Sequence, residues 1–576
     1  MFIRPCHKIK NGKKHAYWAL VESYRTERGP RQRIVAYLGQ MTEAERLGMK
    51  QAAQGNPRPS LKQAGLFDTH AQPKPQWVEV DIAGVQVENE LAFGGPWLAL
   101  QLIHLLELDT FLERVMPPGR EAVPWSQMAL ALTICRLCHP SSELHIAEHY
   151  YRTTALSELL GVPAGWVNDD RLYRALDRLL PHKEALETHL KNRLGGLFEL
   201  KYDLLLYDVT STYFEGQCLG NPMAKRGYSR DQRSDCKQVC IGLVVSRDGM
   251  PLGYEVFEGN RNDVKTWREI VTKMEAQYGR ADRIWCGDRG MLSQDNIEFM
   301  RSGQRKYIIG SSKNTLKRFE RELLQGNWQE VHKGLEVKRC PSPDAADELF
   351  ILCRSRDRRE KEQAMHQRFE VRIETALEKL KAGCEKRNHK KEVIDRRVGS
   401  ILSRNSRAAG LFAVEVTETE GRTTVRWSKN EAWRAWAGLN EGCYLLRTNV
   451  TDWSPEELWR AYIQLTEAEA AFRIHKSDLR IRPVWHQKQD RVLAHILVCF
   501  LAYVLWQTLA VLTRGAGLGD EPRRIFNELG TISLMDVILP TRTGPPIRRR
   551  CVRRPTEHQA ILLDRLGLDL PFQMES

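Results

Sequence analysis

One aspartate of this chain lies inside an apolar strand. The apolar run from Leu204 to Tyr207 leads directly into Asp208 and Val209, so this carboxylate belongs to a strand and not to a loop. A buried carboxylate is costly unless it is paired or binds a cation. Asp203, at the start of the strand, falls on the opposite face and has the character of an edge residue. The pattern therefore predicts a sheet that carries a functional carboxylate at Asp208.

The elements expected around this strand follow a definite order. Strands are predicted at 203–214, 237–246 and 252–257, then a helix at 264–278, a strand at 283–286, a helix at 293–300 and a strand at 307–310. Three antiparallel strands followed by alternating helix and strand form the order of a ribonuclease H-like sheet. The predicted fold class is therefore an α/β ribonuclease H-like catalytic core.

A second aspartate, Asp288, ends the strand at 283–286 and is followed by a turn that opens into the next helix. The carboxyl ends of strands in α/β sheets are where binding and catalytic sites are built. An aspartate that only caps a helix or turn is the alternative interpretation.

A third carboxylate comes from a helix predicted to begin near Trp459. Its polar stripe, at about 100° per residue, contains Tyr462, Glu469, Arg473, Lys476 and Arg480. Glu467 points to about the opposite side, which favours Glu469. The alternative is a series of surface ion pairs, since Glu469 and Arg473 stand four residues apart.

Two strand aspartates and one helix glutamate are hard oxygen ligands. They suit a pair of Mg²⁺ or Mn²⁺ ions and not Zn²⁺, for which clustered Cys and His are expected. Two such ions can activate a water or a 3′-hydroxyl and stabilise the leaving oxygen at phosphorus. The predicted chemistry is therefore phosphodiester cleavage or transfer.

The charge distribution indicates a polyanionic partner. Lys and Arg number 87 against 73 for Asp and Glu, a net charge of +14. Residues 1–50 alone carry 11 basic and 4 acidic side chains, and residues 542–554 contain six arginines. A phosphate-contacting role is predicted for both segments. A solvated charged arm is the alternative for the first.

Composition and periodicity divide the chain into seven segments. The predicted segments are a basic DNA-binding module with β-strands at 1–50, a linker at 51–76, a mainly helical domain at 77–200, the core's first part at 201–310, a β-containing inserted subdomain at 311–446, the core's second part with the Glu469 helix at 447–515, and a basic C-terminal segment at 516–576. A short strand is expected near Val78 to Val85, and one charged helix over 357–397.

The cysteines and the apolar runs predict a cytoplasmic, nucleoid-associated protein without a membrane partner. Thirteen cysteines show no regular spacing, and the N-terminus has no apolar signal core. The longest apolar run, Ile496 to Leu512, is shorter than the roughly 20 residues of a membrane span, so a buried core helix is expected.

These residues together resemble the DDE transposases of bacterial insertion sequences. The string from Tyr462 through Glu469 to Lys476 is similar to the Tyr-x2-Arg-x3-Glu-x6-Lys signature of the IS-four-type superfamily, with Leu465 in place of the arginine. The contexts of Asp208 and Asp288 also resemble the family's. So do three further strings, Gly227-Tyr-Ser-Arg-Asp-Gln-Arg, Gly259-Asn-Arg-Asn-Asp263 and Arg482-Pro-Val-Trp-His486.

The resemblance implies a function and roles for individual residues. Asp208, Asp288 and Glu469 would hold two Mg²⁺ or Mn²⁺ ions. Tyr462 and Lys476 would contact transposon-end DNA. From their place on the same cationic stripe of the helix, Arg473 is expected to replace the missing arginine and Arg480 to be a further DNA contact. The implied activity is cut-and-paste transposition by a homodimer on double-stranded DNA, acting on both transposon ends and target.

Two other functions remain open at this stage. A metal-dependent nuclease on the same fold needs the same carboxylates but joins no ends. A catalytically inactive DNA-binding repressor has no physical need for Asp208 inside a strand.

Overall fold

The computed structural model describes residues 78–574 except Asn388 and Glu420, together with the backbone of three strands nearer the N-terminus. These strands, β1 (Phe2–Lys10), β2 (Lys13–Thr26) and β3 (Gly29–Gly39), pair antiparallel in chain order. The sequence predicted strands within β2 and β3 and missed β1. The predicted linker at 51–76 lies outside the described residues. Binding of DNA by this small sheet stays a prediction.

A helical region follows, as the sequence predicted. Its longer helices are α2 (Gly94–Leu105), α3 (Leu108–Val115), α4 (Trp125–Cys138), α8 (Asp169–Leu179) and α9 (Lys183–Phe198). The strand expected near Val78 to Val85 is wrong, because Asp81 there caps a short 3-10 turn through the Ala83 N–H.

The region also contains the strand β4 (Gln86–Ala92), which connects it to the C-terminal part of the chain. It pairs with β16 (Ser533–Leu539), and β16 pairs on its other side with β17 (Ile547–Val552). A short helix precedes β16, α20 (Pro522–Leu529), and another follows β17, α21 (Glu557–Leu566).

A nine-stranded mixed sheet forms the centre of the molecule. Its order is β10-β11-β12-β15-β9-β8-β5-β6-β7. The bounds are β5 (Leu204–Tyr213), β6 (Gln238–Ser246), β7 (Pro251–Glu258), β8 (Ile284–Gly287), β9 (Lys306–Gly310), β10 (Gln329–His332), β11 (Leu335–Pro341), β12 (Leu349–Ser355) and β15 (Cys443–Thr448). Strands β5, β8 and β9 run parallel, whereas β5, β6 and β7 form an antiparallel meander. The chain order predicted for β5 to β9 is thus confirmed.

The two faces of β5 pack against different helices, because successive side chains of a strand alternate between faces. Leu205 and Tyr207 belong to the core beneath α10 (Asp263–Tyr278). Leu204 and Leu206 belong to the core on the opposite face. That core includes side chains of three helices: α17 (Pro455–Ile463), α18 (Leu465–Ser477) and α19 (Gln489–Gly515). Asp208 shares the parity of Leu206 and therefore faces the α18 side.

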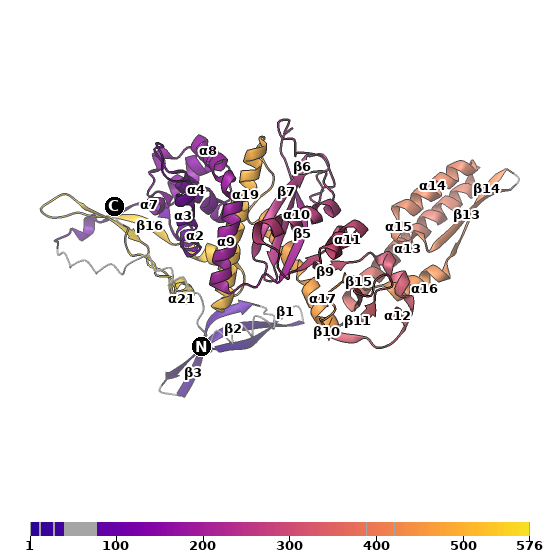
Figure 1. Cartoon of the computed structure of the whole chain (residues 1–576). Helices are drawn as coiled ribbons and strands as arrows, with labels where there is room; N and C mark the ends of the chain where they lie inside the picture. Colours follow the sequence, from indigo (N-terminus) through magenta and orange to yellow (C-terminus); the bar gives the residue numbers. More distant parts are fainter. Residues whose placement is uncertain are drawn as a thin grey trace.

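Helix α19 is the one helix in the described part of the chain that is long and apolar enough to cross a membrane. Its most apolar window has a mean hydropathy of 2.1 and is 94% buried inside the protein. It packs against α4, α8 and α18. Figure 1 shows it between the helical region and the large sheet. The core helix predicted at 496–512 is confirmed.

The chain between β9 and β15 contributes to two parts of the structure. Strands β10 to β12 extend the central sheet, whereas the rest forms a small body with its own apolar core. That body consists of α13 (Arg356–Lys386), α14 (Lys391–Arg404), α15 (Ser406–Ala409), β13 (Phe412–Thr419) and β14 (Arg422–Lys429). It lies at the end of the molecule opposite α2 to α8 in Figure 1. The single charged helix expected at 357–397 is two helices, and α12 (Glu320–Leu324) and α16 (Glu431–Asn440) flank the body in sequence.

Close packing beneath the second aspartate gives a stability prediction. A Cβ on Gly287 would stand 2.4 Å from the ring of Trp267 in α10. Gly287→Ala should therefore destabilise the protein by about 1–3 kcal/mol, the usual cost of overpacking a core. Urea unfolding measures this change. Gly196→Ala, with nothing within 4 Å of the added carbon, is the control. Equal effects of the two substitutions would contradict the expectation.

Candidate active site

Asp208 and Asp288 lie side by side on neighbouring parallel strands. The ladder between β5 and β8 pairs Tyr207 with Gly287, so the next residues of the two strands are Asp208 and Asp288. Asp208 Oδ1 accepts the Val209 N–H at 2.8 Å, and Asp288 Oδ1 accepts the Gly290 N–H at 2.8 Å. The backbone register therefore brings the two predicted aspartates together.

Glu469 lies on α18, the helix that packs over β5. It is exposed, and its negative charge acts on Asp208. Glu467 is half-buried on another side of the helix, where the charges of Asp248 and Arg514 act on it. The structure thus places Glu469 within electrostatic reach of Asp208.

The aspartates have perturbed pKa values. Burial, and then the nearby charges of Asp288 and Glu469, raise the pKa of Asp208 to about 7. Burial, and then the charge of Asp263, raise the pKa of Asp288. The N–H groups of Val209 and Gly290 oppose these shifts. Negative charge is therefore concentrated here in a poorly solvated place.

The donor set fits a hard divalent cation in kind. Carboxylate oxygens are the ligands that Mg²⁺ and Mn²⁺ prefer, and a cation would relieve the repulsion that raises the aspartate pKa values. Within residues 78–574 as described, however, no three His, Cys, Asp or Glu side chains stand close enough together to hold a metal ion. The three carboxylates thus lie in the same region, but their oxygens do not surround a single point.

Two charged residues beside the aspartates had no role assigned from the sequence. Arg230, in the connection between β5 and β6, forms an ion pair of 2.5 Å with Asp263 at the start of α10. The positive charge of Arg230 acts on both Asp208 and Asp288. Both residues fall in strings that resemble the transposase family, and that resemblance was the one signal that could have found them.

Lys476 of α18 lies in a partly buried ion cluster. Its Nζ contacts Oδ1 of Asp231 at 2.8 Å, and Nη1 of Arg482 contacts the same oxygen. Burial lowers the pKa of Lys476 against the opposing effect of Asp231. The sequence predicted Lys476 as a DNA contact, and this stays a prediction.

The other predicted DNA contacts lie around the same helix pair. The single helix expected from Trp459 is divided at Gln464 into α17 and α18. Tyr462, at the end of α17, is half-buried, and a Cβ on Gly310 would stand 2.5 Å from its hydroxyl. Burial, with Cys286 and Asp288 nearby, raises the pKa of this phenol. Arg473 and Arg480 are exposed.

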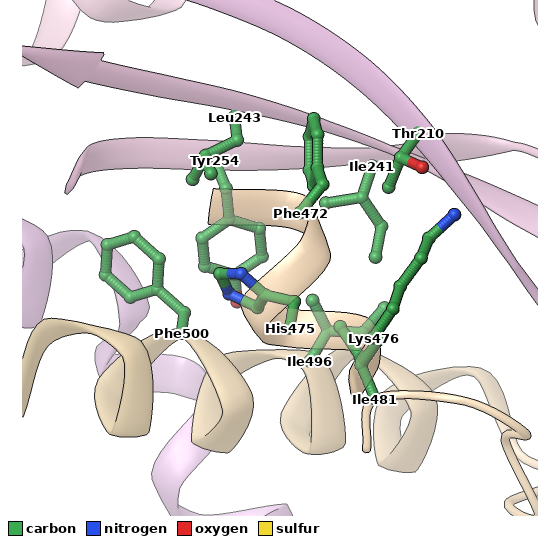
Figure 2. A pocket seen from close by; sticks show the side chains of 10 residues that line it. All are labelled: Thr210, Ile241, Leu243, Tyr254, Phe472, His475, Lys476, Ile481, Ile496 and Phe500. Carbon is green, nitrogen blue, oxygen red and sulfur yellow. The ribbon is translucent and has the colours of Figure 1, made fainter. Parts of the chain in front are cut away.

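A small cavity lies between the sheet and helices α18 and α19, next to this site. Its volume is about 10 Å³, enough for at most about one water molecule. Figure 2 shows an apolar lining around His475, with the Lys476 side chain extending towards Thr210 of β5. The cavity is too small for a substrate, and its lining does not include the three carboxylates.

The C-terminal arginines are partly neutralised within the protein. Arg550 of β17 pairs with Asp536 and Glu158, Arg548 pairs with Glu88, and Arg542 pairs with Glu79. Residues 547–552 of this basic segment form β17, an outer strand of the small sheet with β16 and β4. Phosphate contact by this segment stays a prediction.

Two neighbouring aspartates and a glutamate on the helix that covers them are oxygen ligands of the kind that a divalent cation prefers. The family described as "Transposase DDE domain" matches residues 199–505, more than half of the chain, so this chain belongs to the DDE transposase family. The family described as "IS1634 family transposase, N-terminal domain" matches residues 3–63. The resemblance inferred from the sequence is therefore confirmed, and proteins of this family generally use divalent metal ions.

Other comparisons add little. One similar solved structure is the cryo-EM structure of the piggyBac transposase synaptic complex with hairpin DNA, at 8% identity and a TM-score of 0.35, covering 76% of this chain and 79% of that one. No curated protein matches this chain.

Proposed function

We propose that this protein is a cut-and-paste transposase that binds the terminal inverted repeats of an insertion sequence and catalyses DNA cleavage and strand transfer. The observation that carries the proposal is that Asp208 and Asp288 directly follow the paired residues Tyr207 and Gly287 of neighbouring parallel strands, with the helix that bears Glu469 packed over β5. The family matches support the same activity.

The three carboxylates are the residues that would hold the metal ions. Bound Mg²⁺ or Mn²⁺ supplies activation of a water or 3′-hydroxyl nucleophile and stabilisation of the leaving oxygen. Asp208 and Asp288 supply fixed oxygens, because each is tied to a backbone N–H. Glu469 supplies the third ligand from a helix.

The remaining predicted residues would position DNA. Tyr462, Arg473, Lys476 and Arg480 lie on or directly after α17 and α18 and would contact phosphates near the carboxylates. The basic N-terminal module and the inserted segment 311–446 would bind the terminal repeats. Two copies of the chain would hold two DNA ends as a homodimer.

The test compares wild type with Asp288→Ala on linear DNA that carries the gene's own flanking sequences, in the presence of Mg²⁺. Cut and joined products are expected from wild type, and a loss of at least about a thousandfold is expected from the variant, equivalent to about 4 kcal/mol of transition-state stabilisation. Asp282→Ala, at an exposed aspartate that pairs with Lys306, is the control. Cut but never joined ends would replace the proposal with a nuclease, and binding without cleavage would replace it with a repressor.

A further inference from the structure

Two adjacent residues of the connection between β5 and β6 reach groups of opposite charge. The Arg230 guanidinium pairs with Asp263 on the acidic side of the site, where it also acts on Asp208. The Asp231 carboxylate lies against Lys476 and Arg482. This dipeptide therefore puts a cation among carboxylates and a carboxylate among cations.

The contacts of Asp231 are unusual for a permanent ion pair. Its side chain is 3% exposed, yet both cations approach the same oxygen, Oδ1. Oδ2 is buried and has no hydrogen-bond partner among the described residues. Strong arginine–carboxylate pairs commonly use both oxygens, and a buried acceptor without a partner is costly. Asp231 is therefore held in place without being fully satisfied.

The two cations come from segments next to the carboxylates. Lys476 stands two turns after Glu469 on α18, and Arg482 follows the end of that helix. The Arg482 side chain is 31% exposed, so solvent reaches the pair from one side. Two cations that converge on a single anionic oxygen match the chemistry of a phosphodiester.

We infer that Lys476 and Arg482 form a seat for one DNA phosphodiester, and that Asp231 occupies this phosphate seat in the DNA-free protein. The inference rests on the proposed function for the choice of DNA as ligand. Entry of the phosphate requires Asp231 to leave. Arg230, bonded to Asp231 in the chain, moves with it and frees the neighbouring carboxylates.

The test measures binding of a short fluorescent duplex carrying the flanking sequence to the full chain, without divalent metal. Asp231→Asn should bind about tenfold more tightly than wild type, because a competing carboxylate is gone. Asp235→Asn is the matched control: the same charge is lost from the same connection, but Asp235 is 66% exposed and pairs with Arg233 outside the seat. Affinities of Asp231→Asn and Asp235→Asn that agree within twofold would overturn the inference.

A second variant covers the case in which Asp231→Asn fails to fold. Arg482→Ala should bind the duplex more weakly, with a salt dependence shallower by about 0.9, the value for one lost phosphate contact. An unchanged salt dependence overturns the phosphate seat. Inorganic phosphate is the other source of the same chemistry: if it raises the melting temperature of Asp231→Asn while duplex affinity stays that of Asp235→Asn, the seat is not a DNA site.

Failure here and failure of the proposed function are distinguishable. The binding assay contains no metal and needs no cleavage. Tighter binding by Asp231→Asn without cut or joined products in Mg²⁺ would support the phosphate seat and contradict the proposed transposition. Joined products in Mg²⁺, without a difference in duplex affinity between Asp231→Asn and Asp235→Asn, would support transposition and contradict the phosphate seat.

Discussion

Asp208→Asn should abolish DNA cleavage and, in the metal-free protein, increase stability at about pH 8. The folded protein holds the pKa of Asp208 at about 7, because burial and the charges of Asp288 and Glu469 disfavour its ionised form. The unfolded chain has an aspartate pKa of about 3.9. The raised value means that this group destabilises the fold once it is ionised.

The sign and size of this change in stability follow from proton linkage. Below about pH 4 the carboxyl is protonated in both states, so its effect on stability is small. As pH rises from about 4 to 7 the unfolded chain loses its proton first, and the stability of wild type falls. Asparagine never ionises, so the variant should be more stable by about 2–4 kcal/mol above this window.

Urea unfolding in EDTA, at about pH 4 and about pH 8, measures the effect. Asp203→Asn is the matched control, since Asp203 directly precedes the same strand but is 44% exposed and paired with Arg247. Adding Mg²⁺ should stabilise wild type and not Asp208→Asn. A variant less stable than wild type at the higher pH would show that the negative charge of Asp208 is already compensated in the metal-free fold.

Glu469→Gln should reduce cleavage by about a thousandfold, whereas Glu467→Gln should leave it within about threefold. Both residues lie on α18, two positions apart, and lose the same charge in these variants. The charge of Glu469 acts on Asp208, whereas Asp248 and Arg514 act on Glu467. The pair therefore separates a role at the metal site from a general effect of charge on the helix.

Cleavage of end-bearing DNA in Mg²⁺ is the measurement, with binding of the same DNA as a second readout. Both variants should bind DNA as wild type does. Loss of cleavage in Glu467→Gln alone would reverse the assignment of the third carboxylate. Equal loss in both would point to the fold of α18 as the cause.

The sheet and its two aspartates could be predicted because they depend on local patterns. Alternation along β5 sets the face of Asp208. The connections through α10 and α11 (Gln294–Ser302) allow β8 to pair with β5 and β9 to pair with β8. Asp288 then follows from its position after the last residue of β8. These inferences need no knowledge of distant contacts.

Other features depend on contacts between distant segments and were missed. The seven-residue stripe of Tyr462, Glu469 and Lys476 assumed an unbroken helix, but the helix is divided at Gln464. The Asp231–Lys476 pair joins residues 245 apart in the chain. Strands β10 to β12 of the segment 311–446 join the central sheet because β12 pairs with β15, a pairing that no local period encodes.

The strand order also governs when the proposed metal site is complete during synthesis. A nascent chain that ends at Gly310 already carries β5, β8 and both aspartates, but β15 and α18 lie far downstream. The 181 residues from Asp288 to Glu469 take about 10–40 s to translate at common rates. Products of translation that is interrupted before Glu469 therefore lack one of the three carboxylates that we propose as metal ligands.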